Sequence, residues 1–156
     1  MLRRRSLLRP GPLRPLPPVP PLAPRPLEAL AHAHALLEAG RPAEAAPIFE
    51  RLAEGARERG WPIRAANLAL QASRAHVAAG HAPAAGEWAL MGLRLLARGG
   101  QLGRVPRVLE RTMLALEEAG HPQEAQRLRE RVVEALAQMG LSFEQLGPPD
   151  PPVAAT

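Results

Sequence analysis

Several residue types are missing or rare in this chain of 156 residues, and each absence narrows what the protein can be. Cysteine is absent, which excludes disulfides, thiolate metal sites and cysteine nucleophiles. Tyrosine is absent as well, and two Trp and two Phe make up the entire aromatic content. Because alanine and leucine dominate the 46% hydrophobic content while strand-favouring β-branched and aromatic residues are scarce, we expect an all-α protein.

Side chains that could carry out catalysis are also sparse. The chain holds three serines, two threonines and a single aspartate, Asp150. His32 and His34 are two residues apart, so on a helix they would point to different sides and would chelate a metal poorly. His81 and His121 follow glycines at expected helix ends, where a cationic group suits the negative end of a helix dipole. We therefore expect a non-enzymatic protein with no cofactor and no metal site.

Lysine is absent too, so all twenty basic residues are arginine and the net charge is +5. The codon usage of a GC-rich gene, which the many Ala, Pro and Gly residues also indicate, explains this better than selection for guanidinium chemistry. The charge is unevenly spread, because residues 1–26 hold six arginines and no acidic residue and the rest of the chain sums to −1. A folded body that binds nucleic acid is therefore not expected, whereas a basic arm is.

Residues 1–26 form this arm, and their frequent prolines preclude a helix beyond the first eight or so positions. We expect a disordered, proline-rich arm with polyproline II character. The stretch RPLPPVP, residues 14–20, resembles an SH3-domain ligand, with a solvated spacer as the plainer interpretation. The arginine cluster could also contact anionic lipid or nucleic-acid phosphate.

The arm also carries a possible targeting signal. Residues 4–9, RRSLLR, resemble a twin-arginine export signal, but prolines and Arg14 interrupt the apolar run that should follow. A cleaved organelle presequence is a further alternative. We expect a cytoplasmic protein, and no transmembrane segment because no apolar stretch approaches 18 residues.

A glycine recurs every twenty residues from Gly40 to Gly140, inside a longer period of forty residues. The longer period is plainest in AGRPAEA, AGHAPAA and AGHPQEA, which begin at residues 39, 79 and 119. Each glycine stands where a helix should end in the left-handed conformation, and a proline often follows where a first helical turn accepts it. This punctuation predicts six helices, at roughly 27–39, 42–59, 62–79, 83–98, 104–119 and 122–139.

The predicted helices differ in polarity and regularity. The fourth has few charges and should be central and mostly buried, whereas in the sixth the apolar residues, Val133 and Met139 among them, should share one face. Pro47 should delay or bend the second helix, and GGQLGRVP, residues 99–106, obscures the start of the fifth. A short capping turn is expected over 141–147, followed by a disordered tail, 148–156.

Helix pairs at a constant period are typical of a solenoid, and the pattern resembles the tetratricopeptide repeat (TPR) family. In that family a glycine near the end of a pair's first helix is followed five residues later by an alanine where the two helices cross closely. The matching pairs are Gly40 and Ala45, Gly80 and Ala85, and Gly120 and Ala125. A small residue seven positions before the glycine is also expected, and Ala33 and Ser73 comply whereas Met113 does not.

The resemblance implies a right-handed α-solenoid of three antiparallel helix pairs over residues 27–140, with disordered termini. A period of forty residues exceeds the usual TPR length, so the chain would be a long-helix variant. Helix pairs of the HEAT type, which are of similar length, are the alternative fold.

In the TPR family the first helix of each pair lines a concave groove that binds extended peptides. Counting back from the glycines places seven polar side chains on this face: Arg64, Asn67, Gln71, Arg74, Arg104, Arg107 and Arg111. Residues 61–107 contain six arginines and one glutamate, whereas the segments on either side are net acidic. A basic groove of this kind suits a carboxylate-rich ligand, although ordinary solvated arginines would give the same pattern.

The sequence therefore predicts a scaffold that mediates protein–protein interaction by holding an extended or acidic partner segment in its groove. The alternative is an accessory protein whose basic N-terminal arm binds an anionic membrane or nucleic acid. Homo-oligomers are also possible, since the exposed ends of short solenoids often pair.

Overall fold

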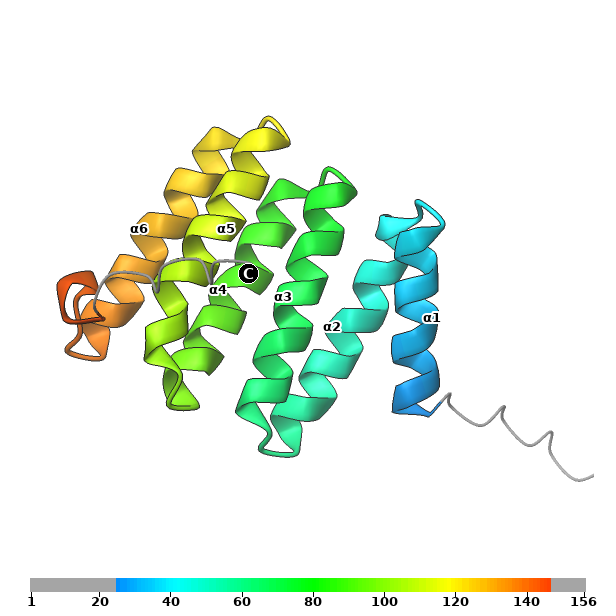
Figure 1. The fold of residues 1–156 in the computed structure, drawn as a ribbon, viewed down its shortest axis with the longest axis horizontal. Coiled ribbons are helices and arrows are strands. Elements are labelled where there is room, and N and C mark those ends of the chain that lie inside the picture. The colour runs from blue at the N-terminus through cyan, green and yellow to red at the C-terminus, as the bar shows by residue number, and fades with distance from the viewer. Residues whose placement is uncertain (1–24, 147–156) are drawn as a thin grey trace, which may run out of the picture.

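The computed structural model of the chain describes residues 25–146, which form six α-helices (Figure 1). Their bounds are α1 Pro26–Glu38, α2 Pro42–Glu58, α3 Pro62–Ala78, α4 Ala82–Arg98, α5 Val105–Glu118 and α6 Pro122–Gln138. Short 3-10 helices cover Leu102–Arg104 (η1) and Phe143–Leu146 (η2), and the described part of the chain contains no strand. The all-α prediction is confirmed. The predicted arm and its motifs before residue 25, and the predicted tail, lie outside the described residues.

Each α-helix ends as the sequence predicts, at a glycine with positive φ. The six values run from 71° at Gly40 to 86° at Gly120, a region that glycine enters without steric cost. The residue after the glycine then donates its N–H back to the helix, as Arg41 does to the Leu36 carbonyl at 2.8 Å. This arrangement satisfies carbonyls that a helix end otherwise leaves unpaired.

The helix starts follow the prolines with small departures. Pro42, Pro62 and Pro122 each occupy the first position of their helix, whereas α4 begins one residue before Pro83. The expectation that Pro47 would delay α2 is wrong, because α2 begins at Pro42 and continues through it. Pro47 lies on the exposed side of α2, where water can bond the Ala43 carbonyl that the missing N–H leaves unpaired. The ambiguous stretch before α5 is occupied by η1.

The helices pack in sequence-adjacent pairs around a continuous alanine- and leucine-rich core. As predicted, α4 is the most buried helix, with ten buried residues between Ala82 and Ala97. Helix α6 has one wet side, but Val133 and Met139, expected on its apolar face, are 45% and 43% exposed. Val133 lies at the edge of the apolar stripe, whereas Met139 is the C-cap residue that follows the last residue of α6.

The alanines of the repeated motif are fully buried at the helix crossings. Ala45, Ala85 and Ala125 have no exposed surface, and the Ser73 hydroxyl donates to the Ala85 carbonyl at 2.8 Å across the α3–α4 contact. The glycine of the motif has a different role. A Cβ atom added at Gly80 would meet no atom within 4 Å, so this position requires glycine for its φ of 77° and not for close packing.

The closest approach between α3 and α4 occurs at two glycines that the motif does not include. A Cβ atom at Gly92 would lie 2.9 Å from the Leu70 side chain and 3.2 Å from the Ala66 carbonyl oxygen. At Gly99 it would lie 2.4 Å from Cδ1 of Ile63. A side chain at Gly92 would press on both Leu70 and the backbone of α3, whereas at Gly99 the end of the Ile63 side chain could shift. Gly92 is therefore the position that limits the spacing of α3 and α4.

Substitution of Gly92 by valine should therefore lower the free energy of unfolding by about 1 to 3 kcal/mol, the usual cost of overpacking. Thermal unfolding followed by circular dichroism measures this change. The matched control is Gly86→Ala in the same helix, where the new Cβ would come no closer than 3.8 Å to Glu124. Because alanine favours helix over glycine, the control should be neutral or more stable. Equal stability of the two variants would contradict this account of the α3–α4 contact.

Candidate functional site

A groove of about 370 Å³ runs between α3 and α5. Five of the seven side chains predicted for a peptide-binding face line it: Asn67, Gln71, Arg74, Arg104 and Arg111. Its apolar lining comes from both helices, chiefly Leu70 and Val77 of α3 and Val108 of α5. The forty-residue spacing thus brings polar groups from successive pairs to one surface, while the binding of a peptide there stays a prediction.

Two of the predicted residues lie outside the lining of this groove. Arg64 lies one turn before Leu68 and lines a separate cleft, where its guanidinium carbon is 5.7 Å from the centre of the Trp61 ring. Arg107 is exposed on α5 without lining the groove, although it lies one turn from Arg111. Counting by fixed offsets identified the correct helices but did not resolve which side of each helix faces the groove.

Four of the seven polar side chains that line the groove, those of Asn67, Ser73, Arg104 and Thr112, already make hydrogen bonds within the protein. Thr112 donates its hydroxyl to the Val108 carbonyl at 2.9 Å, so its hydrogen is used within α5. Arg104 donates to the Gln101 side chain at 2.5 Å and makes a long contact of 3.5 Å to Oδ1 of Asn67. The contact to Asn67 links the start of α5 to α3 and holds the Arg104 guanidinium at the mouth of the groove.

The lining of the groove includes three arginines and no acidic residue. Within the described residues, Arg74, Arg104 and Arg111 form no ion pair. Three positive charges therefore share one concave surface without a negative partner from residues 25–146. A guanidinium group without an ion-pair partner offers forked N–H donors that match the oxygens of a carboxylate or phosphate.

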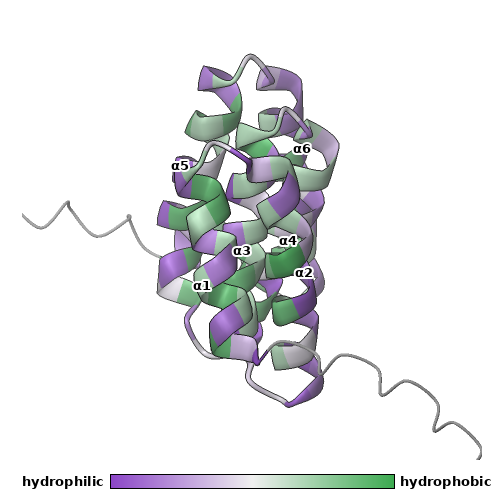
Figure 2. Cartoon of the chain, turned by 90° about the vertical axis from the view of Figure 1, so that its right-hand side faces the viewer, coloured by the Kyte–Doolittle hydropathy of each residue, from purple (hydrophilic) through white to green (hydrophobic). Residues whose placement is uncertain are grey.

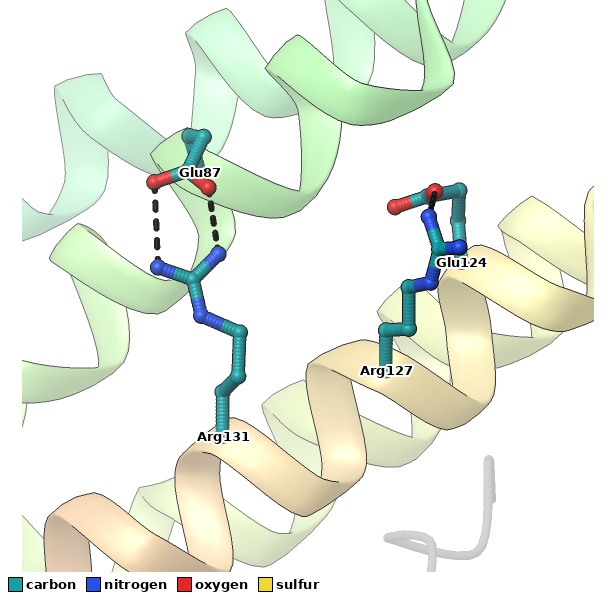
Figure 3. A network of polar contacts seen from close by, with 4 residues as sticks. All are labelled: Glu87, Glu124, Arg127 and Arg131. Carbon is teal, nitrogen blue, oxygen red and sulfur yellow. Dashed lines mark hydrogen bonds and ion pairs between the residues drawn. The ribbon is translucent and has the colours of Figure 1, made fainter.

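On the α4–α6 side of the molecule two arginines are paired with glutamates (Figure 3). Arg127 donates to Glu124 at 2.6 Å, and Arg131 makes a bidentate contact with Glu87 across the two helices, its second bond measuring 3.2 Å. The hydrogen bond from Arg131 lowers the pKa of the Glu87 carboxyl and raises the pKa of Arg131. These two arginines are thus paired, whereas Arg94, Arg98 and Arg129 of the same two helices form no ion pair within residues 25–146.

A buried polar contact that sequence reasoning missed joins α2 to α3. Nε2 of His76 lies 2.5 Å from Oε1 of Glu50, and the histidine is 8% exposed. Its Nδ1 atom is buried without a hydrogen-bond partner among the described residues, and its ring lies 5.7 Å from that of His81. The two partners are 26 residues apart, which a forty-residue repeat gives no reason to align.

No group of three or more His or acidic side chains in residues 25–146 is placed to hold a metal ion. None of the described helices combines the length and apolar character needed to cross a bilayer. Comparison of the chain with family models, curated proteins and solved structures returns no match.

The Glu87–Arg131 pair provides a test of how these surface charges behave. A double-mutant cycle with Glu87→Gln and Arg131→Gln should give a coupling energy of about 0.2 to 1 kcal/mol near neutral pH, since both groups are well exposed. Because the folded pKa of Glu87 is lowered, this coupling should be present above the pKa of Glu87 in the unfolded chain and disappear as pH falls through the folded value. Urea unfolding of the four proteins at neutral and acidic pH measures it. A coupling that persists with the carboxyl protonated would contradict the ionic assignment.

Proposed function

We propose that the protein is a TPR-like scaffold whose α3–α5 groove binds an acidic, extended segment of a partner protein. The observation that carries the proposal is the set of three arginines, Arg74, Arg104 and Arg111, that share one concave surface without an acidic partner among the described residues. All three arginines are exposed, so each alone would attract a carboxylate weakly and their joint positive field would provide most of the attraction. An acidic ligand would supply the missing negative charge.

The proposed solenoid architecture rests on the repeated local geometry of the chain. Three successive helix pairs show the same glycine stop and the same fully buried alanine five residues later. In a right-handed TPR-like solenoid the first helices, α1, α3 and α5, would line one face, and the described groove lies between α3 and α5. A rigid groove between neighbouring repeats suits an extended segment, because each repeat offers side chains to successive ligand residues.

The lining of the groove also indicates how such a segment would be held. Asn67 and Gln71 place two side-chain amides beside the arginines, and an amide can both donate to and accept from a peptide backbone. Leu70, Val77 and Val108 add an apolar strip that could contact a small aliphatic side chain. Charge would therefore supply attraction and orientation, while the amides would hold the backbone.

The test is the combined substitution of Arg74, Arg104 and Arg111 by glutamate in the full-length chain. Binding of a fluorescent glutamate-rich peptide, measured by anisotropy, should weaken by at least about tenfold, because each exposed charge contributes below about 1 kcal/mol and three are reversed. Single substitutions should have small effects. Binding to the wild-type chain should also weaken as salt rises, because the interaction is largely ionic.

The matched control reverses three exposed arginines outside the groove, Arg57, Arg98 and Arg129, and should retain most of the binding. Circular dichroism should show the same helix content for both variants, since glutamate favours helix as well as arginine does. If the control weakens binding as much as the groove variant, the attraction is general and the groove is not the site. If both triple variants bind like wild type, the basic arm carries the interaction and the alternative function is favoured.

A further inference from the structure

The largest hollow found in the described residues is a cleft of about 800 Å³ at the α1 end, separate from the α3–α5 groove. It is bounded by the start of α1, the end of α2 and the start of α3. Figure 1 shows α1 and α2 close together at their connection and apart at the opposite end, where this cleft opens. Apolar side chains make up much of its surface, including Leu27, Leu30, Leu52 and Trp61.

The cleft exists because the first repeat carries small residues where the second carries large ones. Gly55 and Ala56 line it near the end of α2, whereas forty residues later the corresponding positions are Leu95 and Leu96. Those two leucines are 7% and 0% exposed and fill the space beside α3 and α4. The corresponding positions of α2 carry no such side chains, and at the start of α1 Leu27 is 73% exposed while Leu30 packs against the core.

The rim of the cleft is strongly basic. Arg25, Arg51, Arg59 and Arg64 line it together with one acidic residue, Glu28. None of these arginines forms an ion pair within residues 25–146. The guanidinium carbons of Arg59 and Arg64 lie 5.6 Å and 5.7 Å from the centre of the Trp61 ring, within the range of cation–π contacts. Viewed from this end, hydrophobic and hydrophilic ribbon alternate on α1, α2 and α3 (Figure 2).

We propose that this cleft is a second docking surface, for an acidic partner segment that carries a bulky aliphatic side chain. The aliphatic side chain would be buried among Leu27, Leu30 and Leu52, and the flanking carboxylates would pair with the arginines of the rim. The cleft differs in chemistry from the α3–α5 groove, which offers amides and a narrower apolar strip. This inference does not depend on the groove binding a ligand.

Charge complementarity selects this occupant over segments of the chain itself. The N-terminal arm precedes Arg25, which lines the cleft, but residues 1–24 contain five arginines and no acidic residue, so the basic rim would repel them. A second copy placed cleft to cleft would bring eight arginines together across a two-fold axis, which is unfavourable for the same reason.

The experiment compares two fluorescent peptides that consist of glutamate and serine and differ at one central residue, leucine in the first and alanine in the second. Anisotropy titration of the full-length chain should show the leucine peptide binding about tenfold or more tightly than the alanine peptide, the ratio expected for burial of one leucine side chain. The cleft variant Leu27→Glu with Arg51→Glu should reduce this ratio to near one. The matched control, Val133→Glu with Arg129→Glu on α6, changes the same residue classes outside the cleft and should keep the ratio.

The outcomes separate the cleft from the groove. The triple groove variant of Arg74, Arg104 and Arg111 should weaken both peptides but keep the leucine-to-alanine ratio. A ratio near one in the wild-type chain would overturn the cleft proposal and leave the groove proposal intact. If the leucine-to-alanine ratio falls to near one in the groove variant but is kept in the cleft variant, the leucine side chain is buried in the groove. That result would also overturn the cleft proposal. A wild-type dimer in sedimentation that the cleft variant dissociates would show that a second copy occupies the cleft.

Discussion

The left-handed glycine at the end of each α-helix is the constraint on which the arrangement of the whole domain depends. It reverses the chain within a few residues, so consecutive helices must pack against each other in antiparallel fashion. Because the glycines recur every twenty residues, α2, α3, α4 and α6 all have 17 residues. The constant spacing of the turns brings α5 beside α3, so that Gln71 and Arg111, forty residues apart, line one groove. Arg104, which follows Asn67 by 37 residues, also comes within reach of it.

The distribution of charged side chains over the helices bears most directly on which ligand the protein would bind. On the α4–α6 side two arginines are paired with glutamates, Arg131 with Glu87 and Arg127 with Glu124. The α3–α5 groove and the cleft beside α1 hold seven lining arginines that form no ion pair within the described residues. Mutual repulsion of like charges costs stability in the free protein, and an acidic ligand would remove that cost. Both hollows lie beside α3, so one partner could engage them together.

The elements of the fold that depend on local rules could be predicted from the sequence. The glycine stops, the proline starts and the burial of α4 follow from backbone sterics and composition, and the helix bounds agree within one or two residues. The groove was predictable in part, because a fixed period carries Asn67, Gln71 and Arg111 to one surface, but the side of α3 on which Arg64 lies depends on how the helix is rotated in its packing.

Features that depend on distances between helices could not be read from the pattern. The close contact at Gly92 and the space beside Gly55 arise because the repeats differ in side-chain volume at equivalent positions, which a search for similarity between repeats discards. The contact between His76 and Glu50 joins residues that have no common periodicity. In each case the signal was a residue that breaks the repeat, such as a glycine inside a helix or a small pair where the next repeat has two leucines.

The central claim is that an acidic segment binds in the α3–α5 groove through its unpaired arginines. The most direct measurement is an NMR titration of the full-length chain with a glutamate-rich peptide, following the side-chain Nε–H signals of the arginines and the side-chain amides of Asn67 and Gln71. The account predicts saturating shifts at Arg74, Arg104, Arg111 and these two amides, with little change at Arg127 and Arg131, which are already paired. Shifts of similar size at all exposed arginines, or shifts that leave the groove residues unchanged, would contradict it.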